Sequence, residues 1–92
     1  MSSNIGTELE IVLSTFWDRA HQAQETGHEH EARAWLEAIV ELDTNDVEAW
    51  LALAELVPDA REQMLCYSRA LELAPGHPQA KKGLRQARRQ LR

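Results

Sequence analysis

A chain of 92 residues has room for one small domain, and 43% hydrophobic with 27% charged residues is typical of a globular protein. Four Gly and three Pro are too few for an all-β domain with many turns, which favours an all-α fold. The single Cys66 excludes an intramolecular disulfide, so we expect one domain, residues 1–92, held together by packing alone.

The N-terminal segment lacks the features of a signal peptide or a membrane span. No basic residue precedes its apolar residues, and the acidic residues Glu8, Glu10 and Asp18 interrupt the short apolar run. Cys66 lies inside an apolar helical run, which suits a small core side chain in a reducing compartment. These features predict a cytoplasmic protein that does not associate with membranes.

Charge is divided unevenly along the chain. All 15 acidic residues lie at or before Glu72, and residues 1–80 contain only four basic residues, which gives this part a net charge of −11. The last twelve residues carry +6, from Lys81, Lys82, Arg85, Arg88, Arg89 and Arg92. The pattern indicates an acidic body with a basic C-terminal helix.

Two amphipathic helices are expected in the first half of the chain. The first covers about residues 7–26, with a capping box of Thr7 and Glu10 at its start and Gly27 at its end. The second runs from His28 to Leu42. Apolar residues spaced by three and four predict the inward faces: Leu9, Leu13, Phe16, Ala20 and Ala23 in the first helix, and Ala32, Trp35, Leu36, Ile39, Val40 and Leu42 in the second.

Three shorter helices are expected after this pair. Asn45 with Glu48 predicts a capped helix over about 46–57 that Pro58 ends, and Asp59 with Glu62 predicts the next over about 60–74. Pro78 suits the first turn of a last helix over about 78–91. Short connections make consecutive helices antiparallel neighbours. The expected inward residues are Trp50, Leu53, Ala54 and Val57, then Met64, Tyr67, Ala70, Leu71 and Leu73, then Ala80, Leu84, Ala87 and Leu91.

The helices follow a repeat. Phe16 and Trp50 lie 34 residues apart, and each begins the inward stripe of the first helix of a pair. A helix–turn–helix period of this length resembles the tetratricopeptide repeat. The first unit matches the family's turn glycine, small contact residue, bulky residue and apolar pair at Gly27, Ala32, Leu36, Ile39 and Leu42. The second unit matches at Trp50, Leu53, Ala54, Tyr67, Ala70, Leu73 and Pro75.

The sequence also departs from the family pattern. Thr44 stands where the family has its joint proline, Gln63 stands where the small contact residue is expected, and the turn of the second unit is three residues short. The resemblance implies an all-α, short right-handed solenoid of five helices, with the tilt between its third and fourth helices altered. Repeat one would cover about 14–45, repeat two about 46–77, and a capping helix about 78–91.

The resemblance implies that this is a non-enzymatic protein-interaction module, whose partner peptide or helix docks in the concave groove lined by the first helix of each pair. We expect Trp17 to be an aromatic anchor there, because it follows the core residue Phe16. An alternative is that Trp17 only packs against the next helix. The other predicted groove positions are His21, Leu51, Glu55, Lys82 and Gln86, which would make the groove apolar at Trp17 and Leu51, acidic at Glu55 and basic at Lys82.

Two alternatives to the groove remain open. The N-terminal helix pair has no polar cap, and Ile5, Ile11 and Val12 lie beside its inward stripe, so a homodimer through this end would make the protein a self-associating scaffold. The basic C-terminal helix could also contact nucleic acid, but it lacks interleaved aromatic residues and follows a strongly acidic body. Besides acting as a capping helix with a solvated basic face or contacting nucleic acid, this helix could pair electrostatically with the acidic body of another copy.

The sequence offers little site chemistry. His28 and His30 in GHEHE are two residues apart, which places them on different faces of a helix, and no further ligand follows at a metal-site spacing. His21 and His77 have no partner that suggests catalysis, and no phosphate-binding loop or nucleophile motif is present. We therefore expect no enzyme activity, no metal and no cofactor. Some members of the family grip a terminal carboxylate with Lys and Asn, but among the matching positions only Lys82 could serve.

Overall fold

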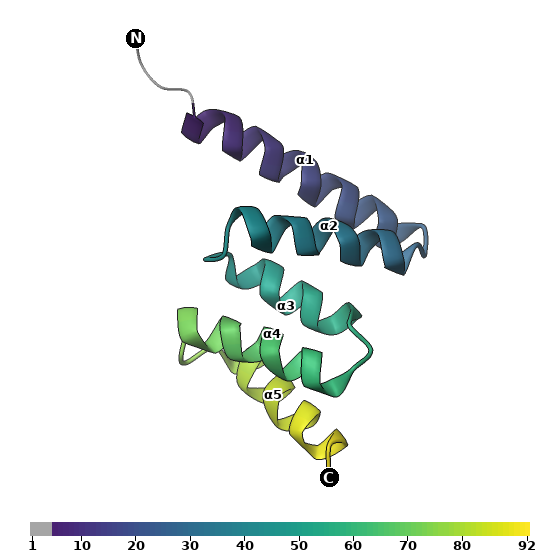
Figure 1. Cartoon of the computed structure of the whole chain (residues 1–92), viewed down its shortest axis with the longest axis vertical. Coiled ribbons are helices and arrows are strands. Elements are labelled where there is room, and N and C mark those ends of the chain that lie inside the picture. Colours follow the sequence, from purple (N-terminus) through teal and green to yellow (C-terminus); the bar gives the residue numbers. More distant parts are fainter. Residues whose placement is uncertain (1–4) are drawn as a thin grey trace.

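The structure, a computed structural model, describes residues 5–92, which form five α-helices and no β-strand. In Figure 1 the helices follow one another in chain order along the long axis, and each packs against the next. The fold class is therefore all-α, as predicted. The helices are α1 (Ile5–Glu25), α2 (Glu29–Leu42), α3 (Val47–Leu56), α4 (Ala60–Leu73) and α5 (Pro78–Gln90).

The molecule is elongated for its size. Its principal extents are 56 × 31 × 17 Å, and its radius of gyration is 14.4 Å. A compact domain of the same length would have a radius of gyration of about 12 Å. The excess arises because the helices are stacked in a row (Figure 1), so that each contacts its neighbours in sequence and little else.

Most predicted helix ends are correct, and local chemistry explains them. Gly27 lies in the turn between α1 and α2 with φ 79°, a left-handed conformation that glycine adopts without strain. Val57 is extended ahead of Pro58, as expected of a residue that precedes proline. Asp59 caps α4, where its side chain accepts a hydrogen bond from the backbone N–H of Arg61, and Pro78 occupies the first turn of α5.

Two predicted caps are wrong. Helix α1 begins at Ile5, so Thr7 lies inside the helix rather than at its cap. The cap of α3 is Asp46, whose Oδ1 accepts from the Ala49 N–H at 3.1 Å, while Asn45 donates its own N–H to Asp43 Oδ1. Adjacent Asn and Asp are equally good caps by type, and the turn at Asp43 decides which of them precedes the helix.

The core runs through the stack as two clusters. The larger one joins the four helices α1 to α4, and the smaller one joins α3, α4 and α5. Trp50 and Tyr67 pack against both clusters, so the core is continuous. The larger cluster contains Ala20, Leu36, Ile39, Val40, Ala49, Leu53, Ala54, Val57 and Cys66, and the smaller contains Leu51, Ala70 and Ala80.

Four leucines that the periodicity places inward are exposed: Leu9, Leu42, Leu73 and Leu91. All four lie near helix ends, where the neighbouring helix no longer covers them. The clearest case is Leu9, because α1 has 21 residues and α2 only 14, which leaves about 10 Å of α1 beyond the end of its neighbour. Periodicity identifies the face of a helix but not the length of the helix that covers it.

Aromatic rings and one glycine lie at two of the contacts between neighbouring helices. Phe16 of α1 lies against Trp35 of α2, with ring centroids 5.0 Å apart and a tilt of 56°. Gly83 of α5 is buried under the ring of Tyr67, and a Cβ at this position would overlap that ring. Helix α5 therefore approaches α4 more closely than any residue with a side chain would allow.

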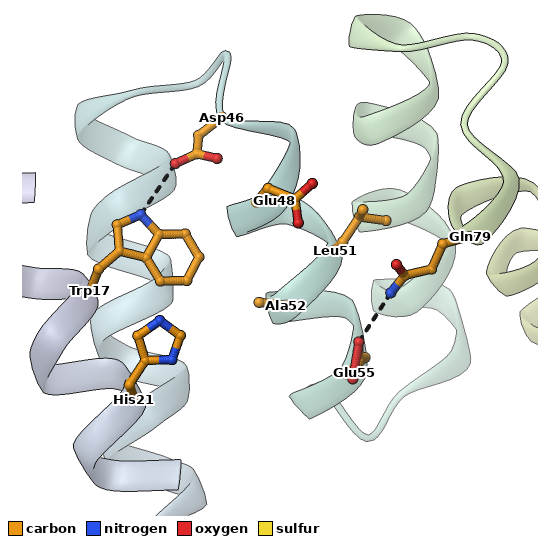
Figure 2. Close-up of a pocket in the computed structure, with 8 residues that line it drawn as sticks. All are labelled: Trp17, His21, Asp46, Glu48, Leu51, Ala52, Glu55 and Gln79. Carbon is orange, nitrogen blue, oxygen red and sulfur yellow. Dashed lines mark hydrogen bonds between the residues drawn. The ribbon is translucent and has the colours of Figure 1, made fainter. Parts of the chain in front are cut away.

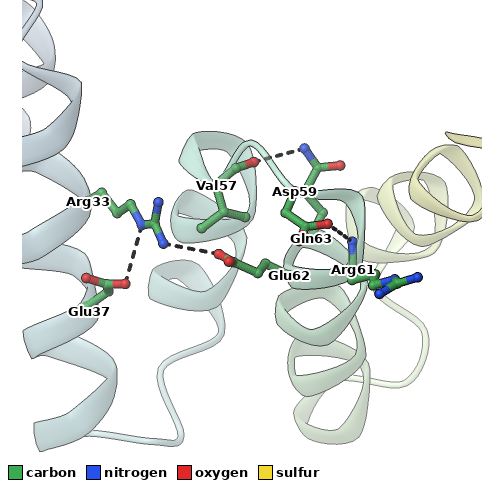
Figure 3. A network of polar contacts seen from close by, with 7 residues as sticks. All are labelled: Arg33, Glu37, Val57, Asp59, Arg61, Glu62 and Gln63. Carbon is green, nitrogen blue, oxygen red and sulfur yellow. Dashed lines mark hydrogen bonds and ion pairs between the residues drawn. The ribbon is translucent and has the colours of Figure 1, made fainter. Parts of the chain in front are cut away.

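Polar contacts join α2, α3 and α4 (Figure 3). Arg33 of α2 pairs with Glu37 at 3.4 Å and with Glu62 of α4 at 3.1 Å. Gln63 donates from Nε2 to the carbonyl oxygen of Val57 at 3.0 Å, which satisfies the backbone where α3 ends. Gln63 thus replaces the small residue of the family pattern with a side chain that serves the shortened turn. The exposed ion pairs stabilise the fold by well under about 1 kcal/mol each.

Candidate functional site

Four of the six predicted groove residues line one cleft (Figure 2). Trp17 and His21 come from α1, and Leu51 and Glu55 from α3. Lys82 and Gln86 are exposed on α5 and do not line it. The cleft has a volume of about 540 Å³, and its other lining residues are Asp46, Glu48, Ala52 and Gln79.

Helical spacing produces both walls of the cleft. Trp17 and His21 are four residues apart, so they lie one turn apart on the same side of α1. Along α3, Leu51 and Ala52 follow Glu48 by three and four residues and precede Glu55 by four and three, so these four residues face the cleft from the other side. Gln79, from the first turn of α5, closes one end by donating from Nε2 to Glu55 Oε1 at 3.2 Å.

Trp17 is held in a fixed orientation. Its indole Nε1–H donates to Asp46 Oδ2 at 3.3 Å, and its ring stacks on the His21 imidazole with centroids 5.3 Å apart and planes 24° apart. The other carboxylate oxygen of Asp46 caps α3. Trp17 is half-buried, lines the cleft and also packs against the larger core cluster.

Leu51 contributes less apolar surface than its groove position suggests. Only 2% of it is exposed, because it packs with Ala70 and Ala80 in the smaller core cluster. It forms the floor of the cleft and cannot be inserted into a partner. The accessible apolar surface therefore comes chiefly from Trp17, which is half-buried, and from Ala52.

The cleft is acidic. Asp46, Glu48 and Glu55 line it, and no lining residue is Lys or Arg. The expected basic end at Lys82 is absent, because Gln79 rather than Lys82 reaches the cleft from α5. The pKa of Tyr67 is raised, mainly by burial and next by the carboxylate of Glu55. Asp46 was not among the predicted groove residues: in the sequence it stands directly before α3, and nothing local to it indicates the contact with Trp17.

The other candidate residues considered in the sequence are the histidines and Cys66. No group of three or more His, Cys, Asp or Glu side chains in residues 5–92 could hold a metal ion. His28 is exposed, and its Nδ1 lies 2.7 Å from the Thr26 hydroxyl. Cys66 is buried, and burial together with Glu62 raises the pKa of its thiol from 9.0 to about 11, which opposes formation of the nucleophilic thiolate. None of the five helices combines the length and the apolar content needed to cross a bilayer.

A comparison with protein-family models found no match, and a comparison with curated proteins found no significant similarity. The likeness to the tetratricopeptide repeat therefore rests on the residues and spacings in the sequence.

Proposed function

We propose that the protein is a non-enzymatic interaction module of tetratricopeptide-repeat type that binds a segment of another protein in the cleft between α1 and α3. One observation carries the proposal: Trp17, His21, Leu51 and Glu55, which lie on two helices, converge on the same cleft. A fixed indole beside a shallow cleft is a common binding anchor, because it buries a large area at a small cost in conformational entropy.

The lining of the cleft indicates the chemistry of the segment. Three carboxylates surround an indole face and a small apolar floor, without a Lys or Arg to neutralise them. A segment with a Lys or Arg next to an apolar residue suits this surface, since the cation meets Glu48 and Glu55 while the apolar side chain covers Trp17. An acidic segment or a terminal carboxylate is repelled, so a carboxylate clamp does not fit.

The test is affinity capture from a cell lysate with three forms of the protein. The cleft variant carries Glu48→Gln and Glu55→Gln, which are exposed positions, so the fold should be retained. The matched control carries Glu29→Gln and Glu41→Gln, which change the net charge equally but lie outside the cleft. Circular dichroism confirms equal helicity before capture. We avoid Leu51→Ala as a probe, because the buried side chain supports the core.

A protein captured by the native and control forms but lost with the cleft variant supports the proposal. Trp17→Phe should weaken the same capture, because phenylalanine keeps apolar contact but loses the bond to Asp46 and part of the ring area. Equal capture by all forms would show that the cleft is not the binding site. Equal loss of capture with the cleft variant and the control would show that the interaction depends on the net charge of the protein and not on the cleft.

A further inference from the structure

The two ends of the helix stack have open outer faces. Helix α1 packs chiefly on α2, and helix α5 chiefly on α4, so within residues 5–92 each terminal helix has one long side without a neighbour. The inward sides are identified by burial: Ala20 and Ala23 in α1, and Ala80, Gly83 and Ala87 in α5. The residues on the opposite sides of these helices determine what the ends can contact.

The outer face of α1 is acidic. Ile11, Thr15, Asp18, Gln22 and Glu25 follow one another at steps of four and three, opposite the inward stripe, and all are exposed. Ile11 has 61% of its surface exposed, which makes it the most exposed large apolar residue described. Helix α1 contains four acidic residues and one basic residue, a net charge of −3.

The outer face of α5 is basic. Lys82, Arg85 and Arg89 lie at steps of three and four, opposite the buried Ala80, Gly83 and Ala87, and all three are exposed. The helix has five basic residues and no acidic residue. None of its cations forms an ion pair within residues 5–92, whereas Arg33 and Arg69 of the body do.

The charges on the two faces have the same spacing. Asp18 and Glu25 are seven residues apart on α1, and Lys82 and Arg89 are seven residues apart on α5. Seven residues span about 10.5 Å along a helix axis, so two such helices laid side by side can form both pairs at once. We propose that the chain self-associates head to tail, with the basic face of α5 of one copy against the acidic face of α1 of a second copy.

Charge also selects this arrangement over a symmetric dimer. Pairing α1 with α1 of another copy would bring two helices of net charge −3 together, and pairing α5 with α5 would bring two helices of +5 together. The homodimer through the N-terminal helix pair is therefore disfavoured, although Ile11 and Val12 are exposed there. The side chain of Ile5, which the sequence analysis also named, lies outside the described side chains. Of the three possible pairings of the terminal helices, only α5 with α1 joins opposite charges.

Head-to-tail contact uses two different surfaces, so a pair of copies still has one free α1 face and one free α5 face, to which further copies can bind. A single helix-on-helix contact is small for a stable protein interface, which makes the association weak and dependent on ionic strength. The outer faces are separate from the lining residues of the cleft, so the self-association does not rest on the proposed function.

The experiment measures mass against concentration by sedimentation equilibrium, after nuclease treatment, at about 20 mM and about 0.5 M salt, conditions that change the Debye length severalfold. At low salt the average mass should rise above the monomer value of 10.5 kDa as concentration increases, and high salt should restore the monomer. A monomer at all concentrations in low salt would overturn the proposal, as would a mass increase that high salt does not reverse.

Charge reversal identifies the surfaces. The head variant, Asp18→Lys with Glu25→Lys, and the tail variant, Lys82→Glu with Arg89→Glu, should each remain monomeric alone. Mixed together they should associate, because the unaltered basic α5 of the head variant faces the unaltered acidic α1 of the tail variant. The control Glu29→Lys with Glu41→Lys should associate at least as well as the native protein. Association of either single variant, failure of the mixture to associate, or failure of the control would contradict the proposal.

The cleft variant Glu48→Gln with Glu55→Gln separates this result from the proposed function. It should lose the captured partner and retain salt-sensitive self-association, because its substitutions lie outside both outer faces. If the cleft variant instead became monomeric, the copy-to-copy contact would involve the cleft, and the pairing of α5 with α1 would be wrong.

Discussion

The two helix pairs of this protein, α1 with α2 and α3 with α4, are closed by different chemistry. In the turn between α1 and α2, the partners of the last α1 carbonyls come from the turn itself: His28 N–H donates to the Ala23 carbonyl at 2.8 Å, the Thr26 hydroxyl donates to it at 3.2 Å, and Gly27 adopts a positive φ. In the turn between α3 and α4 no residue has a positive φ, and the side chain of Gln63, which lies inside α4, donates to the Val57 carbonyl. A helix pair requires a chain reversal and partners for its terminal carbonyls, and either backbone or side chains can supply them.

The largest effect should come from placing glutamine, which the second pair has at Gln63, at the corresponding position of the first pair, Ala32. Ala32 is fully buried at the start of α2, so Ala32→Gln forces a long polar side chain into a space that has no room for it. We expect destabilisation by about 3 kcal/mol, from overpacking and from burial of an amide without partners. Urea denaturation measures the free energy of unfolding.

Ala34→Gln is the control for this exchange, because Ala34 is exposed on the same helix. It should change stability by less than about 0.5 kcal/mol. Equal stability of the two variants would show that the first pair, like the second, accepts glutamine at the contact position.

Gly83→Ala should produce the next largest effect, because it tests how the second pair meets the following helix. The new Cβ would overlap the Tyr67 ring, which is fixed between two core clusters. We expect a loss of about 2 kcal/mol despite the higher helix propensity of alanine. Gly76→Ala is the comparison, since a Cβ there meets nothing within 4 Å. A rise in melting temperature for Gly83→Ala would mean that the ring moves freely.

Gln63→Ala should have a smaller effect, about 1 kcal/mol, through loss of the bond to the Val57 carbonyl. The tetratricopeptide pattern has a small residue at this position, so an argument from the resemblance alone predicts the opposite sign. Thermal unfolding of this variant, with the exposed Gln86→Ala as control, decides between them. Stabilisation would show that the side chain is not needed to close the second turn.

Ionisation of Cys66 should affect the stability of the fold only at alkaline pH. The pKa of its thiol is raised from 9.0 to about 11 by burial and by Glu62, so the unfolded chain releases this proton at lower pH than the folded chain does. Because the folded state then binds more protons, stability is retained below pH 9 and falls as the pH rises from about 9 to about 11. Cys66→Ala should show a smaller fall in melting temperature over this interval, and an unchanged slope would assign the alkaline loss to other groups.

Local features of the sequence determined much of the fold. Gly27, Pro58, Asp59 and Pro78 end or begin helices where the sequence places them, because each acts through its own backbone or through a bond to a residue at most two positions away. The spacing of apolar residues likewise predicted the buried faces at Ala20, Leu36, Ala54 and Ala70, although not their coverage at helix ends such as Leu42.

The candidate site depended on contacts that have no local signature. The sequence placed Trp17, His21, Leu51 and Glu55 at groove positions, and all four line the cleft. It did not predict that Asp46 receives the indole N–H from 29 residues away, or that Gln79 rather than Lys82 reaches Glu55. These outcomes depend on the separation and tilt of whole helices.

By itself, then, the sequence determined the five helices, their order and their inward faces, because these follow from interactions within one or two helical turns. The tertiary structure alone decided which leucines are covered, that Leu51 is a floor rather than an anchor, and that the cleft is acidic without a basic end. The physical reason is distance. Burial and charge at a site are sums over residues that only the packing of the helices brings together.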